Sequence, residues 1–165
     1  MLRAVLFSFA VCLSMLPGAA AAQPDNPVVY TDREGQAIRG YDPVAYFAAG
    51  EPVPGNPAYS FDWQGAKWLF ASVQNRDTFA GNPDRYAPQF GGYCAYAVSQ
   101  GHVLDSNPKV WSVTDGKLYL FLGKDAQAKW SQDIRASIAR AVNNWPSALV
   151  DEGRRKAIAD SGGDR

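Results

Sequence analysis

Residues 59–70 read YSFDWQGAKWLF and have a clear hairpin pattern. Aromatic and polar residues alternate from Tyr59 to Trp63, and an apolar alternation continues through Trp68 and Phe70 after a turn at Gln64-Gly65. Alternation with a period of two is typical of a strand that is buried on one face. A two-residue turn containing glycine joins two such strands into a hairpin. The stretch therefore predicts an antiparallel β-hairpin.

The same reasoning extends to both sides of this hairpin. Strands are predicted at residues 110–114 and 117–122, joined by Asp115-Gly116, a dipeptide suited to a type I′ turn. Two shorter strands are predicted at residues 28–31 and 36–38, around a turn at residues 32–35. Four short helices are expected. One is capped by Ser72 and ends at Gly81, and the others span residues 43–49, 83–86 and 93–100.

The last predicted element is the longest helix, residues 125–145. Apolar residues recur there at spacings of three and four, which places them on one helical face, and Pro146 is expected to end the helix. Hairpins mixed with helices, without strict alternation, predict an α+β domain. We expect one small antiparallel sheet of hairpins with short helices and a long C-terminal helix. The domain is expected to span residues 23–149, followed by a poorly ordered tail at residues 150–165.

The N-terminus has the pattern of a secretory signal. Arg3 is followed by a mostly apolar run to Leu16, a break at Pro17-Gly18 and small residues up to Ala22. The apolar run is shorter than the ~20 residues that a membrane-spanning helix needs. We therefore expect residues 1–22 to be a signal peptide cleaved after Ala22, which predicts a periplasmic or secreted protein without a later membrane span.

Composition restricts the partners and cofactors of the exported chain. The net charge of zero becomes −1 once Arg3 is removed, and no basic stripe is present, so nucleic acid is not an expected partner. Cys12 and both methionines belong to the signal, which leaves Cys94 and His102 as the single thiol and the single imidazole. Copper(I) and zinc prefer several such ligands. A second chain, as in a homodimer, or an envelope protein is the kind of partner that the sequence leaves open.

The chain resembles the YHS domain over roughly residues 40–88, through an Asp-Pro-Val opening, a hairpin, a helix start after Phe-x-Ser, and Phe-x-x-x-Pro-x-x-Tyr. The matching residues are Asp42, Pro43, Val44, Tyr59, Gly65, Trp68, Phe70, Ser72, Phe79, Pro83 and Tyr86. Three later segments, at residues 91–95, 115–119 and 144–146, resemble a secreted branch of that family.

The resemblance implies a YHS-like α+β fold. In the wider family it also implies metal binding through three cysteines, whose positions correspond here to Ala45, Ala71 and Asn75. All three thiols are absent from this chain.

Cys94 is the residue with the most distinctive chemistry. It follows Gly91-Gly92 and is expected in the first turn of the helix at residues 93–100, where the helix dipole stabilises a thiolate. A redox-active or otherwise reactive thiol is one interpretation. The other is a small buried hydrophobe, a common role of free cysteine.

His102 lies eight residues after Cys94, about two helical turns, so the two share one side if the helix continues. With oxygen ligands from Asp105 or Asp42, or with a second chain, they would form a metal site for copper or zinc. A solvated surface histidine is the alternative. A cysteine hydrolase is not expected, because His102 is the one histidine available as a base.

The sequence thus predicts a non-catalytic, exported, YHS-like domain that binds a metal ion or a small ligand through Cys94 and His102. A metal-free interaction module in the cell envelope and a redox-active single-thiol protein stay open as alternatives. The tryptophans are expected in the core rather than on a ligand surface.

Overall fold

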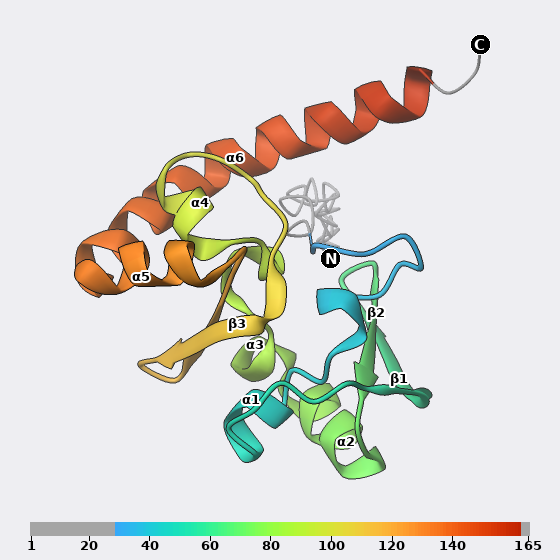
Figure 1. Cartoon of the computed structure of the whole chain (residues 1–165). Helices are drawn as coiled ribbons and strands as arrows, with labels where there is room; N and C mark the ends of the chain where they lie inside the picture. Colours follow the sequence, from blue (N-terminus) through green and yellow to red (C-terminus); the bar gives the residue numbers. More distant parts are fainter. Residues whose placement is uncertain (1–28, 163–165) are drawn as a thin grey trace, which may run out of the picture.

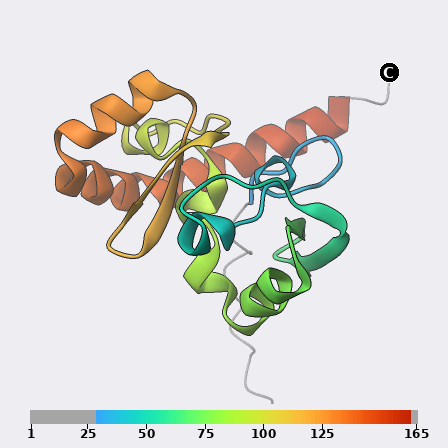
Figure 2. The same cartoon turned by 60° about the horizontal axis from the view of Figure 1, so that its bottom comes forward.

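The computed structural model describes residues 29–162, so the expected signal peptide at residues 1–22 lies outside the described residues. The elements in chain order are η1 (Ile38–Gly40), α1 (Ala45–Ala48), β1 (Asn56–Trp63), β2 (Ala66–Phe70), α2 (Val73–Gly81), α3 (Pro83–Tyr86), η2 (Gln89–Gly92), α4 (Ala95–Ser99), β3 (Asn107–Thr114), β4 (Lys117–Phe121), α5 (Lys124–Gln132) and α6 (Ile134–Gly162). Two views place α2 with the β1–β2 hairpin on one side of the molecule and α4, α5 and α6 on the other (Figure 1, Figure 2).

The fold is α+β, and both predicted hairpins are present. β1 pairs with β2 and β3 pairs with β4, each antiparallel, and both turns have two residues with positive φ, as a type I′ turn requires. The prediction of one small sheet is wrong, because the hairpins form two separate two-stranded sheets. Segments outside the strands pair with the free edges of these sheets. Ala37 N donates to Lys67 O at the edge of β2 (2.8 Å), and Cys94 forms a β-bridge with Leu120 at the edge of β4.

β4 is buried on both faces and connects the two halves of the core. Leu118 and Leu120 belong to one hydrophobic cluster, together with β2, α1 and α2, whereas Tyr119 and Phe121 belong to the other, together with α4 and α5. This division follows from the period of two, because successive side chains of a strand point to opposite faces. A single strand thus supplies side chains to both clusters.

Aromatic residues fill both clusters, as the sequence predicts for the tryptophans. Phe79 of α2 lies among the rings of the first hairpin, with its centroid 5.1 Å from that of Trp68 and 5.2 Å from that of Phe70. In the other cluster, Trp130 of α5 lies 5.2 Å from Tyr119. Trp68 and Trp130 are each 1% exposed, and the other three tryptophans are partly buried against the clusters.

Asp42 is fully buried and joins three segments through its carboxylate. Its Oδ1 accepts from the backbone N–H groups of Val44 (2.8 Å) and Ala45 (3.3 Å). The helix predicted to start at Pro43, with Asp42 as N-cap, starts two residues later, because α1 begins at Ala45 with Val44 as its N-cap residue. Its Oδ2 accepts from Ala71 N (2.9 Å) and Asn75 Nδ2 (2.6 Å), at the junction of β2 and α2. A buried charge is tolerated only when it is hydrogen-bonded in this way.

Several helix boundaries differ from those predicted. The helix expected at residues 93–100 is α4, which begins after Cys94 and has five residues. The strands expected at residues 28–31 and 36–38 are reduced to one bridge between Thr31 and Ala37. The helix after Ser72 is confirmed: the Ser72 hydroxyl accepts from Asn75 N (3.1 Å), which caps α2.

The single helix predicted at residues 125–145 is wrong, because the chain breaks between α5 and α6. Asp133 has φ −149° and ψ 86°, outside the helical region, and its carboxylate accepts from Ala136 N (3.0 Å) in the first turn of α6. Asp is a favoured N-cap, so this residue begins a new helix instead of continuing the old one.

Pro146 does not end the helix as predicted. α6 continues to Gly162, and residues 163–165 lie outside the described residues. The poorly ordered tail at residues 150–165 stays a prediction. Packing lies on both sides of Pro146, since Ala141 and Ala148 are both buried in the core. This packing outweighs the backbone hydrogen bond that proline removes. None of the helices within residues 29–162 has the length and apolar character needed to cross a membrane.

Asp42→Asn is predicted to destabilise the fold by about 2–3 kcal/mol, because an amide NH₂ would face N–H donors that now bond a carboxylate. Asp62→Asn, an exposed position on β1, is the control and should change stability by less than about 0.5 kcal/mol. Urea unfolding of the two variants measures the difference. Equal stability would contradict the role assigned to Asp42.

Alkaline pH is predicted to destabilise the fold through Tyr46. This residue is 2% exposed, and its hydroxyl donates a hydrogen bond to Pro108 O (2.9 Å). Burial raises the pKa of Tyr46 above its usual value of about 10, so its contribution is complete below that pH and is lost as pH rises above it. Tyr46→Phe should cost about 1 kcal/mol at pH 7 and flatten the loss of stability above pH ~10. Denaturant unfolding from pH 7 to 11 tests this, and an unchanged slope would contradict it.

Candidate functional site

The structure separates the four residues that the sequence proposes as ligands. Cys94 and His102 line one pocket, Asp105 lines a second pocket, and Asp42 lies in the scaffold described above. The helix that was expected to align Cys94 with His102 ends at Ser99. The turn after α4 places His102 at the same pocket as Cys94 instead, because Gly101 has φ +81° and His102 N donates back to Ala97 O (2.9 Å).

The first pocket, called the apolar pocket here, has a volume of about 530 Å³ and lies between α4 and the β4–α5 connection. Its lining consists of Cys94, Tyr96, Ala97, Gln100, His102, Leu104, Leu122, Gly123, Lys124, Asp125, Ala126 and Lys129. A volume of this size is within the range of small-molecule sites, which are typically lined by apolar groups with a few polar ones.

Cys94 belongs to the wall of the apolar pocket. It is 1% exposed, precedes α4 as its N-cap residue, and donates its backbone N–H to Leu104 O (2.9 Å). Its bridge to Leu120 fixes the start of α4 against β4. These contacts favour the small buried hydrophobe of the two interpretations, since a thiol that exchanges with another protein needs an accessible sulfur.

The rim of the apolar pocket exposes two large apolar side chains. Leu104 is 48% exposed and Leu122 is 51% exposed, and both line the pocket. Lys129 also lies at the rim, with its Nζ 5.8 Å from the centroid of the Tyr96 ring. Water therefore reaches apolar surface that a bound molecule would remove from it.

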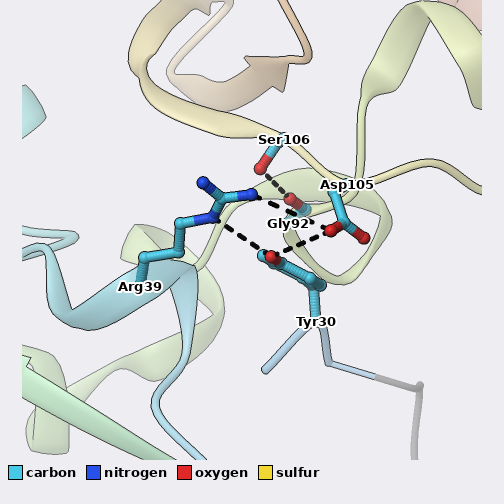
Figure 3. A network of polar contacts seen from close by, with 5 residues as sticks. All are labelled: Tyr30, Arg39, Gly92, Asp105 and Ser106. Atoms are coloured by element: carbon cyan, nitrogen blue, oxygen red, sulfur yellow. Dashed lines mark hydrogen bonds and ion pairs between the residues drawn. The ribbon is translucent and has the colours of Figure 1, made fainter. Parts of the chain in front are cut away.

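The second pocket, called the polar pocket here, has a volume of about 600 Å³ and is lined by Tyr30, Thr31, Asp32, Arg33, Glu34, Arg39, Tyr93 and Asp105. Figure 3 shows Arg39 and Asp105 converging on the Tyr30 hydroxyl. Arg39 Nε donates to that hydroxyl (3.1 Å), which in turn donates to Asp105 Oδ2 (3.3 Å). Arg39 Nη2 is 3.8 Å from the same carboxylate oxygen.

The polar network is held in place by the backbone around it. Arg39 has φ 54° in the left-handed region, which is uncommon for a residue with a side chain. Next to the network, the Ser106 hydroxyl donates to Gly92 O (2.6 Å, Figure 3), which ties the segment containing Asp105 to η2. The pKa of the Tyr30 phenol is raised overall, because the effect of burial exceeds that of the hydrogen bond from Arg39, which lowers it. The phenol therefore stays protonated and donates to Asp105.

Sequence reasoning missed most of the lining of both pockets. Arg39 and Tyr30 are nine residues apart and no motif connects them, so only the folded chain brings them together. Leu122 was predicted as the end of a strand, but β4 ends at Phe121 and leaves Leu122 at the rim. The one sequence signal for a place of Leu122 at the rim is its position between an apolar run and Gly123.

The metal site implied by the resemblance does not fit the residues present. Ala45, Ala71 and Asn75, which correspond to the three cysteines, all direct hydrogen-bond donors to the carboxylate of Asp42. Donors of this kind suit an anion, whereas a metal ion needs lone pairs. Within residues 29–162, no three His, Cys, Asp or Glu side chains are grouped to hold a metal ion.

We predict that the purified chain, prepared without chelator or added metal, carries far less than one equivalent of copper or zinc. Cys94 and His102 supply two ligands, whereas a structural zinc site has four. Elemental analysis of the wild type beside Cys94→Ser tests this. Near-stoichiometric metal that disappears in the variant would contradict the prediction, and half an equivalent would indicate a site shared by two chains.

No family model matches the chain, and the searches of curated proteins and of solved structures give no match either.

Proposed function

We propose that this protein is an exported, non-catalytic domain that binds a small organic ligand in the apolar pocket. One observation carries the proposal: a cavity of about 530 Å³ whose wall contains Cys94 and Ala97 and whose rim exposes Leu104 and Leu122. Ligand sites are typically concave and mostly apolar, with few polar groups, and this pocket has that character.

The non-catalytic part of the proposal rests on the placement of the reactive groups. Nucleophilic catalysis by a cysteine needs a base within hydrogen-bond reach and a third group that orients the base. His102 is the one histidine of the chain, and it is exposed at the rim. Cys94 is 1% exposed, so a disulfide with another protein would require the wall of the pocket to open.

The YHS-like fold is a proposal that rests on the residue pattern. It is supported by the structural roles of the residues that form the pattern: Asp42 joins α1 to α2, Ser72 caps α2 and Phe79 lies at the centre of the aromatic cluster. Export is proposed from the pattern of residues 1–22 alone. Together these proposals describe a small binding domain of the periplasm or the extracellular space.

The function is tested with a neutral apolar dye such as Nile red, whose fluorescence rises in an apolar site. We predict that the dye binds the wild type and that Leu122→Ser weakens binding about tenfold. The exposed half of the Leu122 side chain would no longer be available for apolar contact with the dye.

Val142→Ser is the matched control. Val142 is 57% exposed on α6, outside the lining of the apolar pocket, so its loss should leave dye binding unchanged. Absence of binding to the wild type, or equal effects of the two substitutions, would contradict the proposed function.

A further inference from the structure

We propose that the ligand of the apolar pocket is an amphipathic organic anion, with an alkyl or aryl part inside the pocket and a carboxylate against Lys129. This inference rests on the proposed function and adds to it the chemical class of the ligand. It depends on where charge lies around the pocket.

Positive charge is in excess at the rim. Lys124 and Lys129 line the pocket beside the single acid Asp125, in a chain whose overall net charge is zero. Asp125 lies in the first turn of α5, where a carboxylate stabilises the helix dipole. The excess therefore favours an anionic group at the mouth of the pocket, above an apolar interior.

The two lysines have no carboxylate partner in the described part of the chain. The ion pairs within residues 29–162 involve Arg39 and Arg76 instead. Lys129 Nζ lies 5.8 Å from the centroid of Tyr96, which also lines the pocket, so a cation–π contact holds the ammonium near the mouth. Lys124 Nζ is 3.4 Å from Gln127 Oε1, a neutral acceptor. Both charges are available to a ligand.

The polar pocket is the less suitable place for such an anion. Its Arg39 already contacts Tyr30 and Asp105, and Asp32 and Glu34 add two further carboxylates to the lining. An anion there would face three acids against two arginines, Arg33 and Arg39, of which Arg39 is already paired with Asp105. A carboxylate of a bound ligand therefore has its favourable partners in the apolar pocket.

The experiment compares three ligands with the same alkyl chain and different ends: decanoate, decanol and decyltrimethylammonium. Calorimetry below their micelle concentrations is expected to show decanoate binding tightest and the cation weakest. Lys129→Met should weaken decanoate about threefold, as expected for a solvent-exposed charge pair, and leave decanol unchanged. Raising the salt concentration to about 0.5 M should reduce the advantage of decanoate over decanol.

Lys109→Met is the control, because Lys109 is exposed on β3 and does not line the pocket. If decanol and decanoate bind equally and Lys129→Met has no effect, the anion inference is overturned while the proposed function stands. Tightest binding of the cation would overturn it as well. If none of the three ligands binds and Nile red also fails, the proposed function itself falls.

Discussion

Burial of β4 on both faces holds the two halves of the core together. Leu118 and Leu120 complete the cluster around the first hairpin, while Tyr119 and Phe121 complete the cluster around α4 and α5. A strand with two apolar faces is stable only when both faces are covered. One face lies in the cluster that contains residues of the first hairpin and α2, and the other lies in the cluster that contains residues of α4 and α5. This arrangement makes the two halves one folding unit.

The apolar pocket is a consequence of how the chain enters and leaves this strand. The bridge between Cys94 and Leu120 places the start of α4 against β4, and α4 then packs on α6, where Asn144 Nδ2 donates to the carbonyls of Val98 (3.2 Å) and Ser99 (3.1 Å). The chain leaves β4 at Leu122 and turns through Gly123 into α5. A space between α4 and α5 remains at this point, and it is lined by residues from 94–104 and from 122–129.

Local sequence signals predicted the elements better than their assembly. The alternation at residues 59–70 and the Asp115-Gly116 turn identified both hairpins, and Ser72 and Asp42 marked helix starts, because these features act within a few residues. The separation into two sheets depends on which segments cover the strand edges, and the continuation of α6 past Pro146 depends on burial of Ala148. Of the candidate site, Cys94 and His102 line the same pocket, whereas Asp105 lines another and Asp42 lies in the scaffold, since tertiary contacts determine their neighbours. The apolar lining was not predicted at all.

The sequence spacing of a thiol and an imidazole suggested metal chemistry, whereas the pocket that both line also contains Leu104, Leu122 and two lysines, on which the proposed site for an apolar molecule with one charged end rests. The most direct test is an amide NMR titration of the ¹⁵N-labelled protein with decanoate. We expect the saturable shifts to concentrate at residues 94–104 and 122–129, with little change at the polar pocket around Arg39 or in the first hairpin. Saturable shifts centred on those other regions, or none at concentrations where the dye binds, would contradict it.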